Sequence, residues 1–138
     1  MRAIDAGIKT KFTTKVGDAY PAIYTDVGGR LRNTWAPQGT AFPYIVFQDI
    51  SGTPDVNFTH KHEEYLYQFS LFSADSSSSE IGKMFEDLDT LFDGCTLSVS
   101  DWTFMFMHKE VTRGANRGED KIWYGTVDFR IRLEKIRT

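Results

Sequence analysis

Residues 62–94, HEEYLYQFSLFSADSSSSEIGKMFEDLDTLFDG, decide the fold because their apolar periodicity changes part-way along. Over residues 62–73 successive side chains alternate between two faces, as in a β-strand, and both faces carry aromatic rings. From Ile81 onwards the apolar residues recur every three or four positions, which is the spacing of an amphipathic helix. The stretch therefore predicts a strand followed by a helix, which indicates a mixed α and β fold.

A serine run separates the two segments and has the composition of a linker. Ser77, followed three residues later by Glu80, instead fits a capping box, in which two side chains satisfy free backbone N–H groups at a helix start. Gly94 suits the left-handed position that ends many helices. These signals predict a helix over residues 78–93.

The same patterns predict three more strands and a weaker, N-terminal helix. The helix covers residues 2–16, where Ile4 and Ile8 begin an apolar stripe. Residues 17–41 are irregular, with apolar side chains for a short strand or a covering segment, and Pro43 begins a strand rather than interrupting one. The predicted strands are 44–50, 102–113 and 121–134, and a tight polar loop, GANRGED, joins the last two at 114–120.

Alternation within the last two strands assigns their side chains to faces. In 102–113 one face receives Trp102, Phe104, Phe106 and His108, and the other receives Thr103, Met105, Met107 and Lys109. In 121–134 one face is apolar and the other is polar, with Tyr124, Thr126, Asp128, Arg130, Arg132 and Glu134 on the polar side. The predicted class is α+β: an antiparallel sheet of about four strands with two helices packed on one face, in the order α-β-β-α-β-β.

Composition limits the possible functions. The 138 residues, 41% of them hydrophobic, suit a single domain over 1–138. A net charge of −3 disfavours a general nucleic-acid binder. The single cysteine excludes an intrachain disulfide, no run approaches the ~20 apolar residues of a membrane span, and the first residues lack the apolar core of a secretory signal. We expect a protein made in the cytoplasm with no membrane partner.

No catalytic, cofactor or metal site is predicted. His60 and His62 lie on one side of an extended segment, but a metal site needs about three protein ligands. Glu86, Asp89 and Asp93 share one helix face, which is more typical of a solvated surface than of acid–base chemistry. Cys95 follows a helix C-terminus, the wrong end to stabilise a thiolate, so we expect a buried, inert thiol.

The polar face of the last strand and the GANRGED loop remain as a candidate lumen or partner surface. Their cationic and anionic side chains alternate, and we expect them to face a partner or a channel. The candidate residues are Arg113, Arg117, Asp128, Arg130, Arg132 and Glu134.

Three stretches of the chain resemble a known family. They are GGRLRN…APQGTAFPYIVFQ, EEYLYQFSLFSADSSSSEIGKMFEDLDTLFDG and RGEDKIWYGTVDFRIRLEK. Together they resemble the tail-completion, or tail-terminator, proteins of long-tailed bacteriophages and prophages. The resemblance covers residues 28–135, and residues 1–27 share mainly a helix. It rests on apolar and turn positions, so it carries no interface residue over to this chain.

The resemblance implies a structural virion protein that forms a ring, typically a hexamer, at the head-proximal end of the tail tube. Such a ring ends tube polymerisation, binds the tail tube protein and a head-completion or neck protein, and lets DNA pass through its hole. The alternating charges of the last strand would make weak, salt-screened contact with that DNA.

Three alternatives remain open at this stage. One is a neck or head-completion ring on the portal side. Another, of a different class, is a small α+β enzyme that uses His60, His62 and the acidic helix. The third is a nucleic-acid-binding domain, which the negative net charge disfavours.

Overall fold

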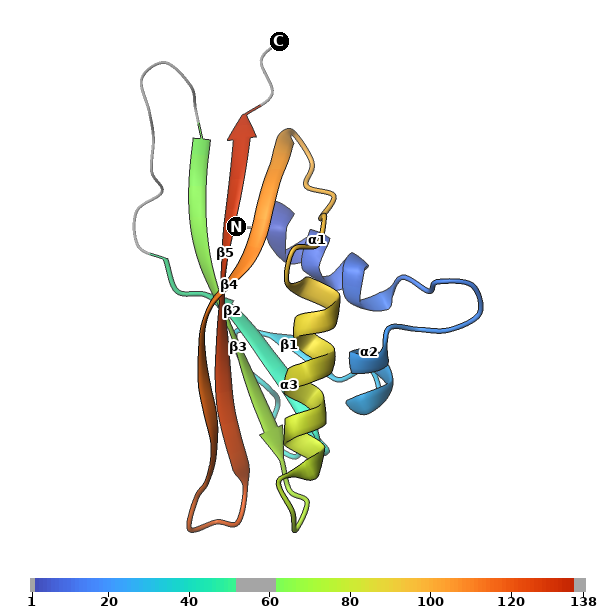
Figure 1. Ribbon diagram of the computed structural model, residues 1–138, viewed down its shortest axis with the longest axis vertical. Coiled ribbons are helices and arrows are strands. Elements are labelled where there is room, and N and C mark those ends of the chain that lie inside the picture. Colours follow the sequence, from blue (N-terminus) through green and yellow to red (C-terminus); the bar gives the residue numbers. More distant parts are fainter. Residues whose placement is uncertain (1, 52–61, 136–138) are drawn as a thin grey trace.

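The computed structural model describes residues 2–51 and 62–135. Within them, five strands form one sheet with the strand order β1-β2-β3-β5-β4, and β1 is parallel to β2 while the other neighbours are antiparallel (Figure 1). The elements are α1 (Arg2–Thr13), α2 (Ala22–Asp26), β1 (Leu31–Asn33), β2 (Tyr44–Asp49), β3 (His62–Ser73), α3 (Ser79–Phe92), β4 (Trp102–Arg117) and β5 (Trp123–Lys135).

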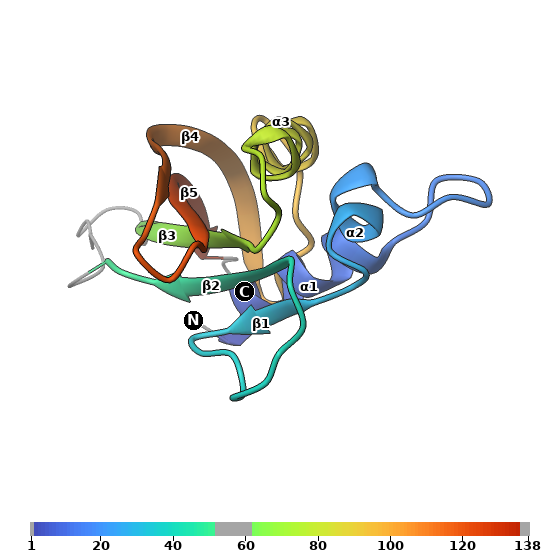
Figure 2. The same cartoon turned by 90° about the horizontal axis from the view of Figure 1, so that it is seen from below.

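The helices lie on one side of a strongly curved sheet, as the view in Figure 2 shows. We call the helix side the inner face of the sheet and the opposite side the outer face. Helix α3 packs against β3, β4 and β5. Helix α1 adds Ile4, Ile8 and Phe12 to the core, and Asp5 of this helix accepts a hydrogen bond from the Tyr67 hydroxyl at 2.7 Å.

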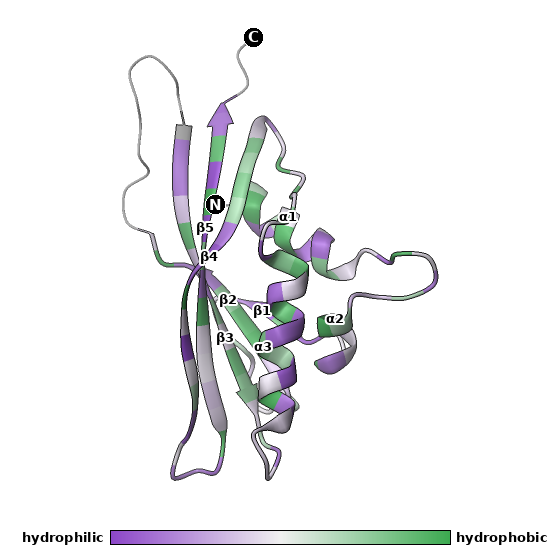
Figure 3. Ribbon diagram, in the orientation of Figure 1, coloured by the Kyte–Doolittle hydropathy of each residue, from purple (hydrophilic) through white to green (hydrophobic). Residues whose placement is uncertain are grey.

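The core consists of the inner-face side chains of the sheet and the apolar stripes of the helices. Purple and green bands alternate along β5 in Figure 3, which reflects this two-sided pattern. Phe69 lies at the centre, with its ring centroid 5.1 Å from that of Phe92 and 5.4 Å from that of Phe129. The sheet and α3 thus bury their predicted faces against each other.

The predicted sheet is correct in part. The strands expected at 44–50, 62–73 and 121–134 are present within a few residues, and the helices expected at 2–16 and 78–93 are present. The four-stranded, fully antiparallel arrangement was wrong, because β1 adds a fifth strand parallel to β2. Helix α2 adds a third helix. Both additions fall in 17–41, where Gly28 and Gly29 adopt positive φ and turn the chain from α2 into β1.

The predicted capping box was also wrong. The N-cap of α3 is Ser78 and makes no side-chain cap hydrogen bond. Glu80 instead accepts a hydrogen bond from the buried Ser73 hydroxyl at 2.6 Å. A buried hydroxyl requires a partner, and Glu80 is within its reach. The expected C-terminal signal is confirmed, since Gly94 has a φ of +73°.

Strand β4 departs most from the sequence-based prediction. It extends to Arg117, so four residues expected in the GANRGED loop belong to a strand. Register shifts interrupt it at Phe104/Phe106, Lys109/Val111 and Arg113/Asn116. The first shift reverses the predicted faces beyond Phe104. Phe106 and His108 pair with outer-face arginines, and Met107 is buried opposite Ile131. Such bulges are frequent in edge strands and discourage pairing with another chain.

Candidate functional site

One end of the outer face carries a network of ion pairs. Strand register places Glu64 of β3 opposite Arg132 of β5, and Arg130 lies two residues further along the same face of β5. The two carboxylate oxygens of Glu64 accept from Arg130 at 3.1 Å and from Arg132 at 3.2 Å. The Arg130 Nε also donates to Glu110 of β4 at 2.7 Å. The hydrogen bond to Glu110 is the main cause of the raised pKa of Arg130. One carboxylate therefore joins two strands, and a second extends the network to the edge.

A second group of polar side chains, on the same three strands, is centred on a nearly buried carboxylate. Asp128 is only 3% exposed, which is rare for a carboxylate. Its two oxygens accept from the Arg113 guanidinium at 2.8 Å and from the Gln68 amide at 3.2 Å. We call the residues of the two groups together the ion-paired end of the outer face: Glu64, Gln68, Glu110, Arg113, Asp128, Arg130 and Arg132.

The structure brings together four of the six predicted surface residues. Arg113, Asp128, Arg130 and Arg132 belong to the ion-paired end. The other two lie apart from it. Glu134 pairs in register with His62 and Thr103 towards the end of β5, and the Arg117 guanidinium lies 5.8 Å from the Trp123 ring centroid, beside the β4–β5 turn.

Sequence reasoning did not include Glu64 and Glu110 in the candidate surface. Glu64 has the right phase on its strand, but its partner follows only from the antiparallel pairing of β3 with β5. Glu110 lies in the register shift between Lys109 and Val111, which no alternation pattern indicates. Strand pairing was the missing information for both residues.

The opposite end of the outer face carries a row of four aromatic rings. Tyr44, Phe72 and Tyr124 lie side by side on β2, β3 and β5 because they are register partners. Their ring centroids are 4.8 and 5.3 Å apart, and Phe42 continues the row 5.2 Å from Tyr44. These spacings are typical of favourable aromatic pairs. We call Phe42, Tyr44, Phe72 and Tyr124 the aromatic row.

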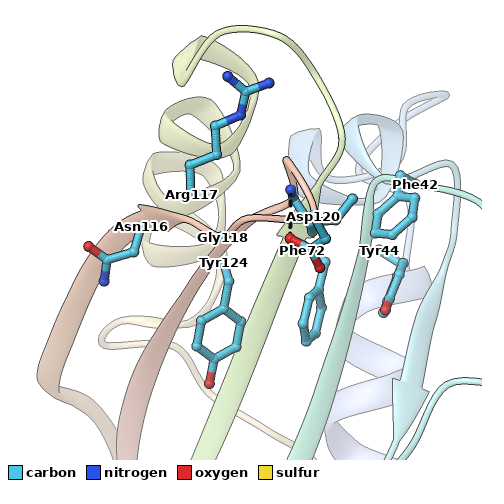
Figure 4. Close-up of a pocket in the computed structure, with 9 residues that line it drawn as sticks. Phe42, Tyr44, Phe72, Asn116, Arg117, Gly118, Asp120 and Tyr124 are labelled. Carbon is cyan, nitrogen blue, oxygen red and sulfur yellow. Dashed lines mark hydrogen bonds between the residues drawn. The ribbon is translucent and has the colours of Figure 1, made fainter.

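The aromatic row forms one wall of an open cavity of about 420 Å³. The turn between β4 and β5 forms the opposite wall. Figure 4 shows Asp120 beside the rings and Arg117 extending from the strand away from them. Asp120 orders the turn, since its Oδ1 accepts from the backbone N–H of Ile122 at 3.1 Å. A concave apolar site with a few polar groups at its rim is the usual form of a binding site.

The residues considered for catalysis are dispersed. His60 lies outside the described residues, and His62 starts β3. Asp89 pairs with the Lys109 ammonium at 2.8 Å, Asp93 accepts from the Lys109 backbone N–H at 3.0 Å, and Glu86 is exposed. These two aspartates thus bind the edge strand β4.

No group of three or more potential metal ligands occurs in residues 2–51 and 62–135. Burial raises the pKa of the Cys95 thiol to about 11, which keeps it protonated at neutral pH. Its sulfur lies 3.7 Å from that of Met107. In the part of the chain that the structure describes, no helix is both long and apolar enough to cross a bilayer.

Asp26, on the helix side of the molecule, has a raised pKa. Asp26 of α2 and Asp87 of α3 share the Lys83 ammonium, at 2.8 and 2.5 Å respectively. Burial, together with the neighbouring Asp87 carboxylate, raises the pKa of Asp26 to about 6. Two carboxylates and one exposed ammonium therefore join α2 to α3.

Comparison with known proteins finds solved structures with a similar fold, but no match by sequence to a family model or a curated protein. A chain in the virion of a native gene transfer agent particle matches with a TM-score of 0.76 at 15% identity, over 96% of both chains. The two chains share a fold. A second solved structure matches with a TM-score of 0.57 at 11% identity, over 99% of this chain and 96% of that one.

Proposed function

We propose that the protein is a structural virion component that forms a ring at the head-proximal end of a phage-type tail tube. The ring ends tube polymerisation and joins the tail to the head. The observation that carries this proposal is the shared fold, over 96% of both chains, with a component of a gene transfer agent virion. The resemblance of residues 28–135 to tail-terminator proteins supports the proposed position in the particle.

The outer face supports a role in contact rather than in chemistry. Its ion-paired end has three arginines, and each of them has a carboxylate partner within the chain. A surface region in which each arginine is neutralised within the chain releases few counterions on meeting DNA, so the ion-paired end binds DNA weakly. Such a surface suits a channel through which DNA has to pass without being held.

The aromatic row supports assembly. Exposed aromatic rings grouped around a concave site are typical of interfaces, where tyrosine and other aromatic side chains supply much of the binding energy. The row is therefore the first place on the outer face where we expect a protein partner.

A length assay with tail tubes tests the proposal. Tube protein from the same virus is allowed to polymerise with and without the purified chain, and tube lengths are measured by electron microscopy. We expect added chain to stop growth and to appear as a ring at one tube end. Native mass spectrometry should give a mass of about six subunits for that ring, the number that the family resemblance implies.

Two results would contradict this role. Tubes that grow to the same length with and without the chain would exclude a terminator. Binding to portal-bearing heads, with no effect on tubes, would assign the chain to the neck instead. Bovine serum albumin at the same mass concentration controls for crowding.

A further inference from the structure

The chain between α1 and α2 forms an ordered, projecting turn. We call residues 14–20 the tip loop, which extends away from the sheet beyond the helices in Figure 1. Val16 and Ala19 close it with two backbone hydrogen bonds, from the Val16 N–H at 2.9 Å and from the Ala19 N–H at 3.4 Å. The Tyr20 ring stacks on Tyr24 with a centroid separation of 3.9 Å.

The side chain of Val16 contributes little to the order of this loop. Its side chain is 83% exposed, and the loop is held by backbone hydrogen bonds and by the Tyr20 stacking. A preformed loop loses little conformational entropy when it binds. The tip loop thus presents an apolar side chain in a geometry that needs no rearrangement to enter a cavity.

The aromatic row lies on a different side of the molecule from the tip loop. It occupies the end of the sheet where β2 and β5 begin and β3 ends, at the bottom of Figure 1, whereas the tip loop projects to the right. One chain cannot bring its own tip loop to its own aromatic row. Two copies can make the contact, and the pair then keeps one free tip loop, on one copy, and one free cavity, on the other.

Charges at the two surfaces are complementary. Lys15 and Asp18 flank Val16 in the tip loop, and Asp120 and Arg117 flank the cavity. Among the residues that the structure describes, neither Asp18 nor Arg117 has an ion-pair partner within the chain. Opposite charges placed in this way select one orientation of the two surfaces.

We infer that the protein self-associates head to tail, with Val16 of one copy inserted between the aromatic row and the β4–β5 turn of the next copy. A contact between two different surfaces is heterologous and closes into a ring when the rotation per subunit allows it. This inference rests on the proposed ring and names the contact that builds it.

Disulfide trapping between copies tests the contact. The native thiol is first removed by Cys95→Ser, and Val16→Cys and Tyr124→Cys are then introduced in separate chains. After oxidation we expect dimers from the mixture and none from either chain alone. A chain that carries both substitutions should give a ladder of bands that ends at the number of subunits in the ring.

The matched control replaces Val16→Cys by Glu86→Cys, a thiol at an exposed position of α3. It should leave Tyr124→Cys uncross-linked. All mixtures are oxidised both at high protein concentration and on capped tail tubes. Absence of a mixed dimer in both conditions, or a dimer of Val16→Cys with itself, would overturn the head-to-tail contact.

The results separate the contact from the function. Capped tubes and ring-sized assemblies without the mixed disulfide would refute the contact and leave the terminator role standing. A mixed disulfide in a protein that leaves tube growth unchanged would support the contact and refute the terminator role.

Discussion

The two ends of the outer face differ in how their side chains are paired. At the ion-paired end, polar side chains from three strands satisfy one another within the chain. At the other end, the aromatic row pairs ring with ring, but leaves Tyr124 44% exposed beside an open cavity. The difference suggests a division of roles, in which the ion-paired end stabilises the chain and the aromatic row is available to a partner. Substitutions at each end test this difference in roles.

The largest loss of stability is expected from Asp128→Ala. Asp128 is nearly buried and accepts hydrogen bonds from two side chains. Its removal leaves the Gln68 amide and the Arg113 guanidinium without this acceptor. We expect the free energy of unfolding to fall by about 1–3 kcal/mol. Urea denaturation measures it, and Glu119→Ala in the exposed turn is the control. A loss of stability no greater than that of the control would show that the ion-paired end does not stabilise the chain.

The second largest effect is a change in the pH dependence of stability, and it is expected at Asp26 in α2. This residue lies on the helix side of the sheet, so it provides a comparison for the outer face. The pKa of Asp26 is raised to about 6, so the folded state holds this proton more tightly than the unfolded state does. Its contribution to stability is therefore present below pH ~4 and is lost as the pH rises through about 6. Asp87, whose pKa is lowered, opposes part of this trend.

Asp26→Asn should remove this pH dependence. Relative to the wild type, we expect it to be more stable by about 1 kcal/mol at pH 7 and to lose that advantage at pH 4. Denaturation series at both pH values give the comparison. A difference between variant and wild type that is constant from pH 4 to 7 would show that Asp26 titrates normally in the folded protein.

A smaller effect is expected from Glu64→Gln. Glu64 pairs with two arginines that are about one third exposed, so solvent screens both pairs. We expect a loss of about 0.5–1 kcal/mol that shrinks as salt is added. Thermal unfolding at low and high ionic strength would detect it. A loss that is independent of salt would point to packing rather than to charge at this position.

The smallest effect on stability is expected at the aromatic row. Tyr124→Ala removes a half-exposed ring, and we expect the free energy of unfolding to change by less than about 1 kcal/mol. Self-association should nevertheless be lost, as light scattering over a concentration series can measure. Tyr124→Phe, which keeps the ring, is the matched control. Full assembly of Tyr124→Ala would contradict the contrast between the two ends.

Local sequence patterns predicted most helices and strands correctly, but they did not predict which strands pair or in which register. The strand at 62–73 and the apolar stripe that begins at Ile81 were visible because burial on one face imposes a period on the sequence. A short strand within 17–41 was one of two possibilities, and it could not be placed because the three residues of β1 are too few to show a period. The faces of β4 were reversed beyond Phe104 because a register shift leaves no mark in an alternation pattern.

From the sequence alone one can read which residues share a face on β3, β5 and α3, since a two-residue or 3.6-residue period follows directly from backbone geometry. The sequence also indicated Arg130 and Arg132 as outer-face residues. The pairing of the strands, in contrast, is visible only in the three-dimensional structure. It places Glu64 between these arginines and brings Tyr44, Phe72 and Tyr124 into one row. Those contacts join residues far apart in the chain, and strand order and register, which no local period encodes, bring them together.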